Sequence, residues 1–151
     1  MRILMVCLGN ICRSPLAQGI LEDRLLRASL SAEVDSAGIG GWHAGEAPDP
    51  RSCAVARKYG MDISAQRARK LELQDLHTFD RIYAMDRQNL RDILHLCGNE
   101  AVKSRISLIM DEVYPGQEME VPDPYYDNAL FEPVFQMLQK ASDQIVLNWM
   151  K

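Results

Sequence analysis

Four short segments of the chain have the length and composition of β-strands, and longer segments with apolar residues at helical spacing separate them. The strand segments are residues 3–6, 33–36, 81–85 and 106–110, and the first is apolar throughout. The helical segments are residues 14–30, 50–59, 86–97 and 132–149, with one or two more helical turns within 71–76. Strands that alternate with helices predict an α/β fold, in which a four-stranded parallel sheet is flanked by helices on both faces.

Capping residues and loops complete this outline. Ser14 before Pro15 predicts the start of the first helix, and Asp49 and Asp86 are the expected N-caps of the next two long helices. Residues 37–48 are rich in glycine and predict a surface loop. Residues 114–128 are rich in proline and lack periodicity, which favours a functional loop.

Size and charge are those of an ordinary globular protein. The 151 residues predict a single domain over 1–151, and the net charge of −4 argues against nucleic acid as the main partner. A small basic cluster, Arg67, Arg69 and Lys70, is expected to be a solvated face. No apolar run is long enough for a signal segment or a membrane span, so we expect a cytoplasmic protein.

The cysteines and histidines do not suggest a metal site. Cys7, Cys12, Cys53 and Cys97 lack the paired spacing of zinc ligands, and the three histidines form no ligand pattern. Cys53 and Cys97 fall at helical positions, where cysteines usually serve as small buried apolar side chains. In a reducing compartment the cysteines are expected to be thiols, unless one of them is reactive.

The segment between the first strand and the first helix is the best candidate for a functional site. In an open parallel sheet, ligands bind beyond the carboxyl ends of the strands, and a helix N-terminus there attracts anions. The loop can curl around a tetrahedral dianion, so that its backbone N–H groups bind the phosphate oxygens. Gly9 and Asn10 tolerate the left-handed backbone that such a curl needs. The loop residues between Cys7 and Arg13 are Leu8, Gly9, Asn10, Ile11 and Cys12.

Cys7 and Arg13 have complementary roles in such a loop. The Arg13 guanidinium can bind two phosphate oxygens at once, and Cys7 lies at the bottom as the nucleophile. The helix N-terminus, the guanidinium and the Ser14 hydroxyl all favour a thiolate without a histidine base. A bare C-x5-R match is common by chance, but its position after a buried strand and before a helix makes it specific. A nucleotide-binding P-loop fits poorly, because the Gly-Lys-Ser/Thr ending is absent.

Transfer of phosphate to a thiolate also needs an acid for the leaving oxygen. Asp123 is the best candidate, because Pro122 and Pro124 stiffen its loop and the fourth strand carries that loop to the same sheet edge. Asp49 and Asp86 compete for this role, but each is expected to cap a helix.

Three aromatic residues lie in predicted loops near the cradle: Trp42, Tyr125 and Tyr126. Taken singly, each is more often part of ordinary packing. Taken together, they favour a cleft that holds an aromatic substrate ring.

These residues together resemble the low-molecular-weight protein tyrosine phosphatase family over nearly the whole chain. The resemblance implies a Rossmann-like, phosphotyrosine protein phosphatase I-like fold, a phosphotyrosine-containing protein as substrate, and no cofactor or metal. It also implies no membrane insertion and a monomer or weak dimer, and in bacterial relatives the substrate is often a tyrosine kinase. The matching segments are CLGNICRSP at 7–15, SAG at 36–38, WH at 42–43, PDPR at 48–51, YAMD at 83–86 and DPYY at 123–126.

The same resemblance implies a two-step reaction. Cys7 attacks phosphotyrosine and becomes a phosphocysteine, Arg13 stabilises the phosphoryl group, and Asp123 first protonates the phenolate and then activates water. The remaining matches are Asn10, Ser14 and Ser36, which hold the loop in shape; Trp42 and Tyr125, which wall the cleft; and Cys12, which can form a reversible disulfide with Cys7. One departure is Gln66, where many members have a histidine that helps to brace the loop asparagine. We expect altered loop rigidity from it, not lost activity.

Three alternatives stay open. A thioredoxin-coupled arsenate reductase shares this fold and loop, but only Cys97 lies where its resolving cysteines are needed. A protein-arginine phosphatase carries threonine where this chain has Ile11, whose apolar side chain suits a phenyl ring. A phosphocarrier would not need Asp123 to drive hydrolysis, and a phosphopeptide-binding module would not need an activated Cys7.

Overall fold

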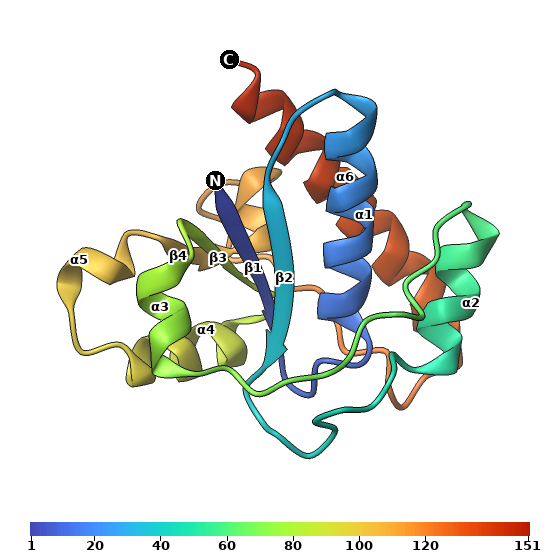
Figure 1. Ribbon diagram of the computed structural model, residues 1–151, viewed down its shortest axis with the longest axis horizontal. Helices are drawn as coiled ribbons and strands as arrows, with labels where there is room; N and C mark the ends of the chain where they lie inside the picture. The colour runs from blue at the N-terminus through green and yellow to red at the C-terminus, as the bar shows by residue number, and fades with distance from the viewer.

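The centre of the molecule is a parallel four-stranded sheet, which the computed structural model describes together with the rest of residues 1–151 (Figure 1). The strands are β1 (Arg2–Cys7), β2 (Glu33–Gly38), β3 (Arg81–Ala84) and β4 (Ile106–Leu108), in the spatial order β2-β1-β3-β4. Every neighbouring pair is parallel, so the carboxyl ends of all strands share one edge. The predicted α/β fold is therefore confirmed.

Helices cover both faces of the sheet, as the alternation of elements predicted. One face packs against α1 (Arg13–Arg27), α2 (Pro50–Lys58) and α6 (Phe131–Trp149), and the other against α3 (Leu73–Thr78), α4 (Arg87–Leu96) and α5 (Glu100–Lys103) (Figure 1). Two 3-10 turns, η1 (Ile109–Glu112) and η2 (Asn128–Leu130), complete the chain. Asp49 and Asp86 cap α2 and α4 through their side chains, as expected.

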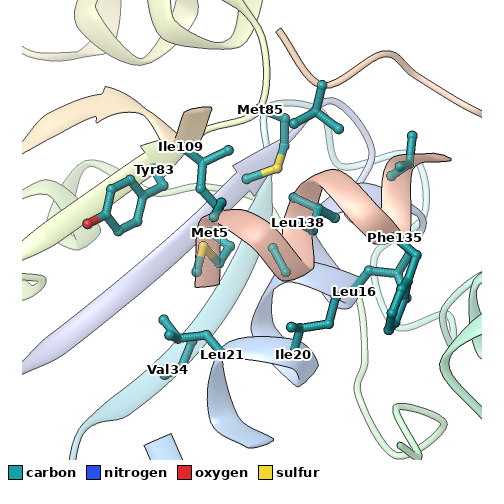
Figure 2. Packing of buried hydrophobic residues seen from close by; sticks show 14 of the residues in the cluster. Met5, Leu16, Ile20, Leu21, Val34, Tyr83, Met85, Ile109, Phe135 and Leu138 are labelled. Carbon is teal, nitrogen blue, oxygen red and sulfur yellow. The ribbon is translucent and has the colours of Figure 1, made fainter. Parts of the chain in front are cut away.

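Strand β1 is apolar throughout because it supplies side chains to two separate cores. Its odd-numbered residues, such as Met5, face α1 and α6, and its even-numbered residues Leu4 and Val6 face α3 and α4. In Figure 2, Met5 and Ile109 from the sheet side and Leu138 from α6 point into the same space. The central strand therefore holds Cys7, its last residue, on a backbone that is packed from both sides.

Several boundaries differ from the prediction. Helix α1 begins at Arg13, and Ser14 is not its cap, because the Ser14 hydroxyl is directed at Cys7 instead. The helix ends at Arg27, before Ser29 adopts a left-handed backbone with φ of 57°. Strand β4 ends at Leu108, where η1 begins, and the four-residue helix α5 is too short to produce a periodic pattern.

Candidate active site

The loop from Leu8 to Cys12 lies where β1 leaves the sheet and α1 begins. The chain after β2 supports it from one side, because the N–H of Ile39 donates to the Cys7 carbonyl and the N–H of Gly40 donates to the Leu8 carbonyl, each at 2.9 Å. These bonds extend the β1–β2 pairing past the sheet edge. The start of the loop is therefore held by backbone hydrogen bonds to the segment after β2.

Asn10 is the buried centre of the loop. Its backbone has φ of 59°, the left-handed conformation predicted for this position. Its Nδ2 donates to Ser14 Oγ at 2.8 Å and to Ser36 Oγ at 2.9 Å, and its Oδ1 accepts from the N–H of Arg69 at 3.0 Å. One side chain thus joins the loop to α1, to β2 and to the segment that precedes α3.

The Cys7 thiol is buried at the base of the loop, and its Sγ lies 3.0 Å from Ser14 Oγ. Because Asn10 Nδ2 already donates to that hydroxyl oxygen, the hydroxyl proton is free to point at the sulfur. Ser14 is therefore arranged to donate to Cys7, and such a donor stabilises a thiolate.

Arg13 is almost completely buried, with 2% of its surface exposed. Its Nη1 donates to Asp86 Oδ2 at 2.6 Å and to the Val121 carbonyl at 3.0 Å, while its Nη2 lies 3.6 Å from Asp123 Oδ2. Burial on its own disfavours the charged guanidinium, but the neighbouring Cys7 and Asp86 outweigh it and raise the pKa of Arg13. The group is thus a fixed cation with one edge anchored.

Asp86, which the sequence favoured as a helix cap over a candidate acid, makes two contacts at this site. Its Oδ1 does accept from the N–H of Asn89 at 2.7 Å, while its Oδ2 anchors Arg13. The signal that could have revealed the second role is its position directly after β3, at the edge where the strands end.

Asp123 approaches this site from the far end of the chain. The N–H of Tyr125 donates to its Oδ1 at 3.1 Å, and Oδ2 is the oxygen nearest to Arg13. The Asp123 side chain is 40% exposed, so the carboxylate lies at the solvent-exposed side of the site and not at its buried base beside Cys7. Cys7, Arg13 and Asp123 thus meet from three different segments.

Cys7, Arg13 and Asp123 line one cavity of about 280 Å³. Among the predicted cleft residues, Trp42 lies against Gly40 and is 70% exposed, while the rings of Tyr125 and Tyr126 meet edge to face at 4.9 Å. The lining residues are Cys7, Leu8, Gly9, Ile11, Cys12, Arg13, Trp42, His43, Asp123, Tyr125 and Tyr126. The predicted cradle residues Asn10 and Ser14, with Ser36, lie behind this surface.

His43 is the lining residue that had no predicted role. Its ring lies against Gly9, and its Nδ1 is 2.6 Å from Glu46 Oε2. Its position beside Trp42 in the same loop was the available signal.

Cys12 shares the cavity with Cys7 but differs in its surroundings. Burial, followed by the negative charges of Asp49, Cys7 and Asp123, raises the pKa of the Cys12 thiol to about 12. Cys12 therefore stays a neutral thiol at physiological pH, beside the candidate nucleophile.

The Gln66 Nε2 donates to the Pro15 carbonyl at 3.0 Å, and Asn10 Oδ1 accepts from the Arg69 N–H instead. The expectation that Arg69 belongs to a solvated face was wrong, because its guanidinium pairs with Asp35 and Asp75. The segment thus braces the loop through its backbone.

No group of three or more His, Cys, Asp and Glu side chains is arranged to hold a metal ion. None of the helices combines the length and the apolar surface that crossing a membrane requires.

Comparison with known proteins gives consistent matches. A sequence profile described as "Low molecular weight phosphotyrosine protein phosphatase" matches residues 2–151. The low molecular weight protein-tyrosine-phosphatase YfkJ of Bacillus subtilis is 38% identical over 151 residues, which cover 99% of this chain and 96% of that protein. Its crystal structure has a TM-score of 0.91 at 37% identity, covering 98% of this chain and 93% of that one.

Two other crystal structures are equally close in shape. A protein tyrosine phosphatase from Entamoeba histolytica has a TM-score of 0.92 at 33% identity, covering 99% of this chain and 97% of that one. A Drosophila arginine phosphatase has a TM-score of 0.92 at 26% identity, covering 100% and 99%.

Fold, sequence profile and relatives together define the class as that of the cysteine-dependent protein tyrosine phosphatases. Within that class the match extends over nearly the full length of the chain. The chain belongs to the low molecular weight phosphotyrosine protein phosphatase family, and the resemblance noted in its sequence is confirmed.

Proposed function

We propose that this protein hydrolyses phosphotyrosine in proteins, and small aryl phosphates, through a phosphocysteine on Cys7. The observation that carries the proposal is the convergence of the Cys7 thiol, the anchored Arg13 guanidinium and the Asp123 carboxylate on one cavity. A nucleophile, a fixed cation and an acid are the groups that transfer of a phosphoryl group to a thiolate needs.

In the first step, the Cys7 thiolate attacks phosphorus and the bond from phosphorus to the phenolic oxygen breaks. Asp123 gives its proton to that oxygen, so tyrosine leaves as a neutral phenol. The loop N–H groups and Arg13 hold the other phosphoryl oxygens, where charge is concentrated in the transition state. Asp86 supports this role because it fixes Arg13 from the opposite edge.

In the second step, water attacks the phosphocysteine and Asp123 accepts its proton. The sulfur–phosphorus bond breaks, inorganic phosphate leaves, and the Cys7 thiolate is regenerated with Ser14 as its hydrogen-bond donor. A phosphocarrier would have to preserve the intermediate, and an acidic group 3.6 Å from Arg13 works against that.

The substrate class rests on the walls of the cavity. Ile11 and the aromatic residues Trp42, Tyr125 and Tyr126 offer apolar and ring contacts that suit a phenyl group. Because a Drosophila arginine phosphatase shares the fold, overall shape does not distinguish phosphotyrosine from phosphoarginine. A direct comparison of matched phosphotyrosine and phosphoarginine peptides decides this point, and a preference for phosphoarginine would overturn the proposed substrate.

The nucleophile and the acid are tested separately. Cys7→Ser is expected to abolish turnover of an aryl phosphate, while the matched control Cys97→Ser, at the end of α4, leaves it unchanged. Asp123→Ala is expected to slow phosphotyrosine hydrolysis by about 100-fold or more, the usual range for a lost general acid. Wild-type turnover in Cys7→Ser, or an unchanged rate in Asp123→Ala, would remove that residue from the mechanism.

A further inference from the structure

The segment Pro48–Ser52 contacts the backbone of the candidate nucleophile loop. The N–H of Asp49 donates to the Ile11 carbonyl at 2.8 Å, and the Ser52 hydroxyl donates to the Cys12 carbonyl at 3.4 Å. Asp49 and Ser52 belong to the start of α2, which packs against α1 and α6. The position of the cradle backbone is therefore tied to the start of α2.

Arg51, in the same segment, reaches the loop that carries Asp123. Its Nη1 donates to the Tyr125 carbonyl at 2.9 Å and to Asn128 Oδ1 at 2.7 Å. The guanidinium also lies over the rings of Tyr125 and Phe131, with 5.5 Å and 4.6 Å to their centroids. One side chain thus contacts the acid loop, η2 and the first residue of α6.

The Arg51 side chain is held rigidly by Asp49. Nε donates to Asp49 Oδ1 at 3.0 Å and Nη2 donates to Asp49 Oδ2 at 2.9 Å. These hydrogen bonds lower the pKa of Asp49, so its carboxylate is charged at neutral pH. A helix cap would need only the bond from the Arg51 N–H to Asp49 Oδ1; the two-pronged pairing in addition fixes the plane and direction of the guanidinium.

Asp123 lies between two points at which the acid loop is pinned. On one side, the Val121 N–H donates to the Met85 carbonyl and the Val121 carbonyl accepts from Arg13. On the other side, the Tyr125 carbonyl accepts from Arg51, and the Tyr125 N–H holds the Asp123 carboxylate. Moving the backbone of Tyr125 would therefore move the carboxylate directly.

From this chain of contacts we propose that Arg51 is a positioning residue, which sets Asp123 relative to the nucleophile loop through Asp49 and the Tyr125 carbonyl. Arg51 is not among the residues that line the cavity, so it acts through the acid and not on the substrate. The inference rests on the proposed function, in which Asp123 protonates the leaving oxygen. Substitution of Arg51 is therefore expected to lower kcat/KM most for substrates whose leaving group needs a proton.

The test compares kcat/KM for two aryl phosphates whose leaving groups differ in acidity. Phenyl phosphate releases a basic phenolate that needs the acid, whereas 2,4-dinitrophenyl phosphate releases a stable anion that does not. Arg51→Ala is expected to lower kcat/KM for phenyl phosphate by about 10–100-fold, the range for a misplaced catalytic group. The loss for 2,4-dinitrophenyl phosphate should be less than about threefold, and inhibition by inorganic phosphate should be unchanged.

Arg57→Ala is the matched control, since Arg57 lies exposed on the same helix. This substitution is expected to leave kcat/KM unchanged for both substrates. Arg51→Lys serves if Arg51→Ala does not fold, because the three N–H donors of one ammonium cannot replace the four hydrogen bonds that the planar guanidinium donates to Asp49, Tyr125 and Asn128. In an Asp123→Ala background, Arg51→Ala should cause no further loss, as expected for two residues that act as one unit.

Equal losses for both substrates, or losses that multiply in the double variant, would overturn the role of Arg51 while leaving the proposed function standing. If Asp123→Ala itself shows no dependence on the leaving group, the assignment of the acid fails instead. If the wild-type protein hydrolyses neither compound, the proposed function fails. The three failures are therefore distinguishable in one set of assays.

Discussion

Replacement of Asn10 by alanine is the perturbation that should damage the candidate active site most through structure alone. Asn10 is 2% exposed, and its side chain makes the three hydrogen bonds to Ser14, Ser36 and Arg69. Alanine would leave the Ser36 hydroxyl and the Arg69 N–H without their partner in a buried setting. It would also have to adopt a left-handed backbone that its Cβ disfavours.

The expected magnitude follows from these contacts. Neutral hydrogen bonds contribute about 1 kcal/mol each, so the loss of all of them destabilises the fold by about 3 kcal/mol. The left-handed backbone adds about 1 kcal/mol for alanine, which glycine avoids. Asn10→Ala should therefore lower the free energy of unfolding by about 4 kcal/mol, and Asn10→Gly by about 3 kcal/mol.

Urea unfolding followed by circular dichroism measures these differences, with kcat/KM for an aryl phosphate measured alongside. Ser36→Ala, which removes one of the bonds, should cost about 1 kcal/mol. Arg57→Ala, on the exposed side of α2, should stay within about 0.5 kcal/mol of the wild type. A loss below about 1 kcal/mol for Asn10→Ala would refute the reasoning, because the network would then contribute nothing net.

Three further predictions concern the cavity and the core. The ordinary pKa of a thiol is 9.0 and that of Cys12 is about 12, so the folded state keeps a proton that the unfolded state releases between these values. Stability should therefore fall as the pH rises from 9.0 toward 12, and Cys12→Ala should flatten that decline in urea unfolding at pH 8–11. A Cβ at residue 40 would lie 2.0 Å from the Trp42 ring, so Gly40→Ala should displace that ring and raise KM severalfold with little change in kcat. Gly41→Ala is its control, because the nearest atom there is at 3.4 Å. Phe135→Ala, which removes a fully buried ring stacked on Tyr59, should cost about 3–5 kcal/mol in the same unfolding assay.

Most of the fold could be predicted from local patterns. The apolar run of β1, the Asp49 and Asp86 caps and the apolar face of α6 are each read within one segment, because propensity and periodicity act over a few residues. The failures were equally local. Ser14 is of a residue type that often caps helices, but its hydroxyl contacts Cys7 and Asn10, and the N-cap is Cys12, two residues earlier.

The sequence by itself determined the cradle, since Cys7, Asn10, Arg13 and Ser14 lie within eight residues of one another and their geometry follows from a strand that turns directly into a helix. Only the tertiary structure decided what completes it. Asp86 reaches Arg13 across 73 residues, Val121 across 108, and Arg51 reaches Tyr125 across 74. Such pairings depend on which strands become neighbours and where their ends meet, which no local pattern encodes. That is why the contact of Asp86 with Arg13 was not predicted, and why Arg51 had no role until the two loops were seen together.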